Sequence, residues 1–438
     1  MPAVNLSEYL ARADAAEPIV AYGKIAEVAG LTIQATGPKM KIGDLCHVQS
    51  DGGAAHIPVE VVGFRDHRIL LMPLGDMRGI APGNLLIPTH RSRMVRVGEG
   101  LLGRVIGAMG NPIDGGLPPQ WTQEVPLHAD PPPPMARRRI AEPIATGIRA
   151  VDACVTCGKG QRIAIMSGSG IGKSKMIGMI ARNTNADVNI IALIGERGRE
   201  VREFIESDLG PEGLRRSVVV VATADEPALV RLSGAYAATA AAEWFRAQGA
   251  DVMLVMDSLT RFAMAQREIG LAVGEPPTTK GYPPSVYSLL PKLLERAGAD
   301  GRGSITGFYA VLVEADDLND PIGDAVRSIT DGHVALSRAL ATRNHYPAVD
   351  VLESVSRSMI EVTSENHQAL AARIRQILAT YRDAEDLVNI GAYVAGSNPE
   401  IDTALRLMPK IREFLQQGLF EASPYAEIEP RMAAALKG

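Results

Sequence analysis

The sequence predicts an α/β protein, with a β-barrel first, then a central domain built on a parallel sheet, and a helical C-terminal domain. Short β-rich runs alternate with Gly, Pro and Asp turns in the first quarter of the chain. After Ala150, apolar strand-like runs alternate with helical stretches, at residues 162–166, 188–195, 217–222, 251–256 and 304–313. From about Ser364 onward the apolar residues recur at helical spacing.

The expected domain boundaries follow changes in composition. The barrel is expected at residues 18–106, where the β-rich runs lie. Residues 107–145 contain four consecutive prolines and three consecutive arginines, so they cannot be helical throughout and are expected to connect the barrel to the core. The core is expected at residues 146–363 and the helical domain at residues 364–438. A chain of 438 residues exceeds one usual hydrophobic core, which agrees with several domains.

Residues 1–17 are expected to form an N-terminal amphipathic segment that Ser7 can cap. Its apolar residues fall on one helical face: Leu6, Tyr9, Leu10 and Ala13. The segment either packs on its own domain or docks a partner, and the sequence does not decide between these two.

Composition excludes several classes of protein. Hydrophobic residues make up 46% and charged residues 22% of the chain, a balance typical of folded protein. The formal net charge of -5 gives no general attraction to nucleic acid or anionic lipid. The apolar runs are far shorter than the roughly 20 residues that cross a bilayer, and the N-terminus lacks a secretory signal. We therefore expect a cytoplasmic chain without a transmembrane segment.

Three cysteines occur, and this number does not describe a disulfide scaffold. Cys154 and Cys157 form a CxxC pair, but neither a second pair nor a histidine cluster completes a metal site. The pair could be read as a redox pair, but we interpret Cys154 and Cys157 as small buried residues before a strand.

A glycine-rich loop is the strongest chemical signal in the sequence. Residues 167–174 read Ser-Gly-Ser-Gly-Ile-Gly-Lys-Ser, between a strand and an apolar helical stretch. Such glycines let the backbone wrap a polyphosphate, whose charge faces the helix N-terminus, while Lys173 neutralises the outer phosphates and Ser174 ligates magnesium. The alternative is a chance glycine turn. The predicted nucleotide-binding residues are Gly168, Ser169, Gly170, Ile171, Gly172, Lys173 and Ser174.

The loop departs from the strict pattern at its first position. That pattern begins with glycine, whereas this chain has Ser167. If the position requires a positive φ, the Cβ of Ser167 costs about 1 kcal/mol.

Two further strands end in carboxylates. Asp257 follows an apolar run and is expected to hold the water shell of magnesium, the alternative being a helix cap. Glu196 and Arg197 follow another run, at the edge where parallel sheets bind ligands. A carboxylate there polarises attacking water, but residues 196–200 also read as a solvated charge run, and the spacing alone does not decide.

Read with their flanks, these strands resemble the rotary (F/V-type) ATPases of the phosphate-loop, RecA-like fold, and most closely the type III protein export ATPases, in particular the flagellum-specific ATPase. The resemblance covers essentially the whole chain. It is carried by residues 146–152, 195–200, 257–267, 274–277, 280–285, 315–321, 331–333, 345–350 and 354–357.

The resemblance implies roles for single residues. Glu196 would activate water, with Arg197 beside it, and Lys173 would contact the phosphates. Tyr346 would stack on adenine, the alternative being an ordinary core aromatic. Arg357 would be an arginine finger for the neighbouring subunit, the alternative being a structural salt bridge.

The resemblance also implies ATP and Mg²⁺ as ligands and a homohexameric ring as the assembly. The expected partners are a negative regulator at the N-terminus, a central stalk protein, export-gate membrane proteins and substrate–chaperone complexes. The protein would be cytoplasmic and peripheral, at the cytoplasmic face of the inner-membrane export apparatus.

Several related functions compete with flagellar export. Injectisome ATPases are near relatives, although residues 389–399 look more flagellar. A catalytic rotary ATP synthase subunit is disfavoured because residues 381–393 lack its acidic lever motif, and the non-catalytic subunit has Gln where this chain has Glu196. A hexameric RNA translocase needs a basic, aromatic surface, whereas aromatics are 4% of this acidic chain.

Overall fold

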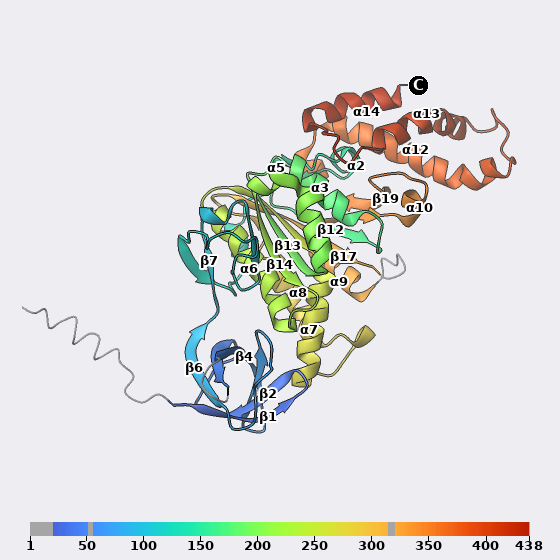
Figure 1. The fold of residues 1–438 in the computed structure, drawn as a ribbon. Coiled ribbons are helices and arrows are strands. Elements are labelled where there is room, and N and C mark those ends of the chain that lie inside the picture. The colour runs from blue at the N-terminus through green and yellow to red at the C-terminus, as the bar shows by residue number, and fades with distance from the viewer. Residues whose placement is uncertain (1–20, 51–55, 314–319, 438) are drawn as a thin grey trace, which may run out of the picture. The chain divides into compact units, whose positions relative to one another are not determined.

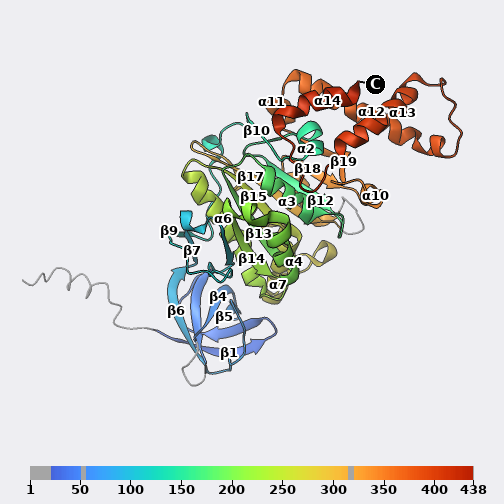
Figure 2. The same ribbon diagram turned by 45° about the horizontal axis from the view of Figure 1, so that its top comes forward.

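The computed structural model describes residues 21–50, 56–313 and 320–437 (Figures 1 and 2). The chain divides into two compact units, with the boundary between Arg93 and Met94. The predicted fold class is confirmed, since a closed barrel, a mainly parallel sheet and a set of C-terminal helices follow one another along the chain. The amphipathic segment expected at residues 1–17 and residues 315–319 of the motif 315–321 lie outside the described residues.

The first unit is a closed barrel with the strand order β1-β2-β5-β4-β3-β6. Alternate residues of β3, such as Cys46 and Val48, point into an apolar interior. Residues 94–106, which the sequence assigned to the barrel, supply strands outside it: β7 (Met94–Val97) pairs with β9 (Gln123–Pro126), and β8 (Arg104–Gly107) joins the large sheet. The barrel strands are β1 (Gly23–Ala29), β2 (Thr32–Thr36), β3 (Asp44–Gln49), β4 (His56–Arg65), β5 (Arg68–Pro73) and β6 (Leu85–Ser92).

The second unit is built on a sheet with the order β19-β18-β12-β17-β15-β13-β14-β8. All of these strands are parallel except β19, which runs antiparallel to β18. The inner strands are buried along nearly their whole length because helices cover the sheet. Their bounds are β8 (Arg104–Gly107), β12 (Arg162–Ser167), β13 (Val188–Glu196), β14 (Ser217–Thr223), β15 (Asp251–Asp257), β17 (Ser304–Leu312), β18 (Gly332–Leu336) and β19 (Val349–Ser356).

Helices connect these strands, and short elements complete the unit. The helix α6 packs against β13, β14 and β15. The helices are α2 (Arg149–Cys154), α3 (Lys173–Asn183), α4 (Gly198–Glu203), the π-helix η3 (Phe204–Leu209), α5 (Gly210–Arg215), α6 (Ala228–Ala247), α7 (Leu259–Val273), α8 (Pro284–Leu294), α9 (Pro321–Ile329), α10 (Arg338–Thr342) and α11 (Met359–Val362). The minor strands are β7 (Met94–Val97), β9 (Gln123–Pro126), β10 (Pro143–Ile144), β11 (Cys157–Gly158) and β16 (Gly298–Ala299).

The C-terminal helices are α12 (Glu365–Asn389), α13 (Pro399–Leu415) and α14 (Ile428–Leu436), which pack on one another and on α2. Ser364 caps α12, since its hydroxyl accepts from the backbone N–H of His367 at 3.0 Å. The buried side chain of Arg149 on α2 donates from Nε to the carbonyl of Phe414 at 2.7 Å and pairs with Glu421. These contacts fix the C-terminal helices to α2 of the core.

The three cysteines are buried and free. Burial raises the pKa of the Cys46 thiol to about 11 and that of Cys154 to about 12, so both thiols stay protonated at neutral pH. Within the described ranges, no helix has the length and apolar composition needed to cross a membrane.

A buried ion pair near α6 gives the first prediction. Arg296 is 1% exposed, donates to both carboxylate oxygens of Glu243 at 2.8 and 2.6 Å, and donates to the carbonyl of Leu127 at 3.0 Å. Arg296→Met should lower the free energy of unfolding by about 3 kcal/mol, because the Glu243 carboxylate then lacks its partner. The measurement is urea denaturation followed by circular dichroism. The control is Arg202→Met, which removes an exposed pair with Glu206 and should cost less than about 1 kcal/mol; equal losses would contradict the prediction.

Candidate active site

The carboxyl ends of three parallel strands bring Lys173, Glu196 and Asp257 together. The strands β12, β13 and β15 run in the same direction, so their last residues lie at one edge of the sheet. The ammonium group of Lys173, which opens α3, donates to Asp257 Oδ1 in a buried ion pair. The distance from Lys173 Nζ to Glu196 Oε1 is 4.0 Å. A lysine and two carboxylates thus meet where the glycine loop begins a helix.

The glycine loop needs its glycines at two positions. Gly170 and Gly172 have φ of 77° and 97°, in the left-handed region that residues with a Cβ rarely adopt. Gly172 also lies against Tyr346, since a Cβ there would be 3.5 Å from the ring atom Cε1. Ile171 is buried and anchors the loop, whereas Ser169 and Gly170 are exposed. The loop therefore presents backbone to solvent, as a phosphate cradle requires.

Ser167 carries no backbone cost at the first position of the loop. It is the last residue of β12 and pairs with Leu312 on β17, so it has strand conformation. The left-handed conformation that would penalise a Cβ occurs at Gly170 and Gly172 instead. The Ser167 hydroxyl is fully buried and has no hydrogen-bond partner in the part of the chain that the structure describes.

The electrostatics of Glu196 suit a general base. Burial, and then the negative charge of Asp257, raise the pKa of Glu196 from 4.5 to about 7, against the opposing charge of Lys173. The carboxyl group also shares a hydrogen bond with Glu200 on α4. A carboxylate whose pKa lies near neutral pH accepts a proton from water more readily than an ordinary glutamate.

Asp257 is 3% exposed, and its carboxylate is turned to Lys173. The cap of α7 is Ser258, whose hydroxyl accepts from the backbone N–H of Arg261 at 3.4 Å, so helix capping does not account for Asp257. Ser174, in the first turn of α3, is exposed. A hydroxyl and a carboxylate at this edge are the oxygen ligands that Mg²⁺ prefers.

Arg197 is turned away from the lysine–carboxylate cluster. Its side chain is 78% exposed and donates from Nη1 to Glu200 Oε1 at 2.9 Å. Within the described part of the chain, the Arg197 side chain is connected to the cluster through Glu200, which shares a hydrogen bond with Glu196.

An apolar cavity of about 310 Å³ adjoins the glycine loop. Tyr346 and Pro347 form one wall, Met176 and Met179 on α3 form another, and Leu419 closes it from the C-terminal part. Tyr346 is 43% exposed, so it is not an ordinary core aromatic. A flat, apolar group fits between these walls, beside the glycine loop.

Arg357 lies at the opposite edge of the sheet from the glycine loop. Because β19 runs antiparallel, its last residue pairs with Gly332 at the start of β18. The backbone N–H of Arg357 donates to the Asp331 carbonyl at 2.9 Å, and that of Asp331 donates to the carbonyl of Arg162, the first residue of β12. The six residues of β12, roughly 20 Å of strand, therefore separate Arg357 from its own loop.

The Arg357 side chain is exposed. It makes no hydrogen bond or ion pair with any residue that the structure describes, so a structural salt bridge finds no support. The guanidinium is free to act on another molecule.

Sequence reasoning missed several residues at this site. Glu200 lies in the first turn of α4, four residues after the strand-ending Glu196, and its place in the charged run 196–200 was the available signal. Arg261, in the first turn of α7, has a buried Nε without a partner among the described residues. Gln417 donates its backbone N–H to the Tyr346 carbonyl at 2.9 Å, and no local pattern links positions so far apart.

A glycine loop between a buried strand and a helix, with its lysine paired to a strand-ending aspartate, defines a phosphate-loop nucleoside triphosphatase. The model of the ATP synthase alpha/beta family, nucleotide-binding domain, matches residues 147–356, and that of the T3SS EscN ATPase C-terminal domain matches residues 363–434. The chain therefore belongs to the ATP synthase alpha/beta family, in the group of flagellum-specific ATP synthases and type 3 secretion system ATPases. The resemblance predicted from the sequence is confirmed.

Individual relatives support this placement. A flagellum-specific ATP synthase of Bacillus subtilis is 55% identical over 401 residues, which cover 91% of this chain and 92% of the relative. A type 3 secretion system ATPase of Sinorhizobium fredii is 49% identical, over 93% of this chain and 90% of the relative. The solved structure of the assembled ATPase EscN from enteropathogenic E. coli has a TM-score of 0.90 and 44% identity, and covers 94% of this chain and 100% of that chain.

Proposed function

We propose that the chain hydrolyses ATP to ADP and phosphate, with Mg²⁺, as a subunit of a homohexameric ring that energises the export of flagellar proteins. The observation that carries the proposal is the cluster of Lys173, Asp257 and Glu196 beside the glycine loop. It unites a phosphate-binding cation, a magnesium-side carboxylate and a carboxylate with a raised pKa. The family membership supports it independently.

Each residue has a distinct role in this mechanism. The backbone of residues 168–172 and Lys173 hold the outer phosphates, and Ser174 and Asp257 hold Mg²⁺. The bound metal supplies positive charge against the transferring phosphoryl group. Glu196 orients water and takes its proton, and Tyr346 stacks on adenine. Arg197 supports Glu196 through Glu200.

The placement of Arg357 supports shared sites in a ring. Since Arg357 and the glycine loop lie at opposite edges of one sheet, a head-to-tail neighbour can bring its Arg357 to this subunit's phosphates. The assembled EscN structure is a precedent for self-assembly in a relative.

The proposed partners are those that the resemblance implies. EscN has been solved in complex with its central stalk EscO, and we propose an equivalent stalk protein here. A negative regulator at the N-terminus, export-gate membrane proteins and substrate–chaperone complexes complete the proposed set. They would place the protein in the cytoplasm, at the cytoplasmic face of the inner membrane.

An experiment distinguishes flagellar from injectisome use, which the Sinorhizobium fredii relative keeps as the second candidate. The gene is expressed in Bacillus subtilis lacking its own flagellum-specific ATP synthase. Wild-type protein should restore swimming, and Lys173→Ala should not. Restored secretion in a strain lacking its type 3 secretion ATPase, without restored swimming, would favour the injectisome.

The stacking role of Tyr346 gives a second prediction. Tyr346→Ala should weaken ADP binding by roughly 10- to 100-fold, because base stacking on an aromatic contributes about 1–3 kcal/mol. Tyr346→Phe keeps the ring and should bind within about threefold of wild type. Titration calorimetry with ADP measures both. Equal loss in the two variants would assign the effect to the hydroxyl and contradict stacking.

The raised pKa of Glu196 gives a third prediction. Its carboxyl group is protonated below about pH 7 and ionised above it, and only the ionised form accepts a proton from water. The kcat/KM for MgATP, which reports the free enzyme, should therefore fall as the pH drops through about 7. The residual activity of Glu196→Gln should lack this inflection; a midpoint unchanged in that variant would assign the titration to another group.

A further inference from the structure

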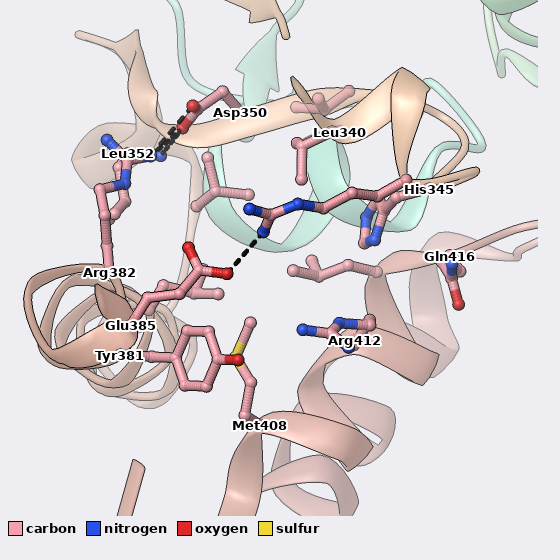
Figure 3. Close-up of a pocket in the computed structure, with 15 residues that line it drawn as sticks. Leu340, His345, Asp350, Leu352, Tyr381, Arg382, Glu385, Met408, Arg412 and Gln416 are labelled. Carbon is pink, nitrogen blue, oxygen red and sulfur yellow. Dashed lines mark hydrogen bonds and ion pairs between the residues drawn. The ribbon is translucent and has the colours of Figure 1, made fainter. Parts of the chain in front are cut away.

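A second cavity, of about 340 Å³, lies between the core and the C-terminal helices (Figure 3). Leu340 and Val349 line it from the core side, and Leu378, Met408 and Leu415 line it from α12 and α13. This volume falls at the lower end of the range for small-molecule sites. The walls therefore suit one small ligand with an apolar body.

Charged side chains surround this apolar interior, and all but one are paired. Arg343 Nη1 lies 2.7 Å from Glu385 Oε1, and Arg382 Nη2 lies 2.7 Å from Asp350 Oδ1. Arg412, on α13, has no carboxylate within ion-pair distance among the residues that the structure describes. Arg382 also pairs with Glu353, which does not line the cavity, at 3.0 Å, so Arg412 is the one guanidinium of the lining without a carboxylate partner among the described residues.

The Arg412 guanidinium affects the titration of a neighbour in the cavity. Figure 3 shows Arg412 across the space from His345. Burial, and then the positive charge of Arg412, lower the pKa of His345, so this imidazole is neutral at pH 7 and adds no second cation. An anionic group beside Arg412 would find one guanidinium and a neutral hydrogen-bonding ring.

The same two chain segments form this cavity and the cavity at Tyr346. In one segment, His345 lines the second cavity and its neighbour Tyr346 lines the cavity beside the glycine loop. In the other segment, Gln416 lines the second cavity and its neighbour Gln417 lines the cavity beside the glycine loop. The Gln417 N–H donates to the Tyr346 carbonyl at 2.9 Å and ties the segments together. A ligand that holds these segments in one cavity therefore also holds the wall of the other.

We propose that this second cavity binds a small amphipathic anion, with its apolar body between the core and the C-terminal helices and its carboxylate on Arg412, and that its occupancy tightens nucleotide binding at Tyr346. The binding half of the proposal stands on the cavity alone. The coupling half rests on the proposed nucleotide site.

The binding half is tested with three probes that share one body: 4-phenylbutyrate, 4-phenylbutan-1-ol and 4-phenylbutylamine. Titration calorimetry on the full chain, without nucleotide, should show the acid binding about tenfold or more tighter than the alcohol, as one charge-assisted hydrogen bond gives. The amine should bind weakest. Equal affinities of acid and alcohol, or no binding of the acid at millimolar concentration, would overturn the proposal.

Amino-acid substitutions test whether the acid binds in this cavity. Arg412→Gln should abolish the preference for the acid and leave the alcohol's affinity unchanged. The matched control is Arg406→Gln, an exposed arginine on the same helix that does not line the cavity, and it should behave as wild type. Leu378→Trp should fill the space and remove binding of all three probes, with circular dichroism used to verify the fold. Acid binding that survives both Arg412→Gln and Leu378→Trp would place the probe elsewhere.

The coupling half is tested by linkage. Saturating 4-phenylbutyrate should raise ADP affinity about fivefold, and saturating ADP should raise the affinity of 4-phenylbutyrate by the same factor. Leu378→Trp should bind ADP without responding to the acid. If 4-phenylbutyrate binds and ADP affinity does not change, the proposed coupling between the two cavities is wrong. If ADP does not bind at all, the proposed function is wrong. The titrations with the three probes then still test whether the second cavity binds an anion.

Discussion

Replacing Glu196 with glutamine is expected to leave ATP bound and to lower kcat by roughly two to four orders of magnitude, the usual contribution of a general base. Glutamine keeps the size of the side chain but cannot take a proton from water. The ion pair between Lys173 and Asp257 is untouched, so phosphate binding remains. The measurements are phosphate release at saturating MgATP and, separately, ATP binding by calorimetry.

The control for this variant is Glu203→Gln, since Glu203 lies on α4 with a 54% exposed side chain. It should hydrolyse ATP at the wild-type rate. If Glu196→Gln also turns over at the wild-type rate, Glu196 has no part in the chemistry. If it loses ATP binding as well, the residue acts in binding rather than in activating water.

Replacing Arg357 with alanine should lower kcat by roughly three to five orders of magnitude, the effect of removing an arginine finger. The same loss is expected for Lys173→Ala, for a different reason, because the outer phosphates then lack their lysine. When Arg357→Ala subunits are mixed one to one with Lys173→Ala subunits, roughly a quarter of the interfaces in the rings combine an intact Lys173 with an intact Arg357 from the next subunit. Mixed rings should therefore regain up to about a quarter of wild-type turnover.

The mixing experiment has a direct control. Lys173→Ala mixed with the double variant Lys173→Ala/Arg357→Ala contains no complete interface and should stay inactive. Native mass spectrometry verifies that the rings are mixed. Absence of rescue in verified mixed rings would show that Arg357 does not act across the interface.

The sequence was sufficient for the architecture and for the phosphate side of the site. Strand ends in a parallel sheet share one edge, so Glu196 and Asp257, which end β13 and β15, lie near Lys173, which follows the glycine loop after β12. The glycine loop could be predicted from the sequence because its spacing is set by backbone geometry. The strand conformation of Ser167 means that its Cβ carries no backbone cost.

The remaining parts of the site depend on contacts between distant segments. The cavity at Tyr346 combines residues of α3 with Leu419 from beyond α13, and no local periodicity reports such a pairing. The orientation of Arg197 toward Glu200 likewise depends on how α4 leaves β13. The end of the barrel at Ser92 was missed because strands β7 and β8 have the same composition as barrel strands.

The antiparallel strand β19 has a consequence for the proposed ring. Tyr346 lies just before this strand and Arg357 just after it, at its two ends. In the proposed ring, eight residues of strand, roughly 26 Å, would thus link the base site of one subunit to the phosphate site of the next. Because the two ends of β19 would serve different sites, each subunit would link its own site to that of one neighbour, which gives the proposed ring a direction.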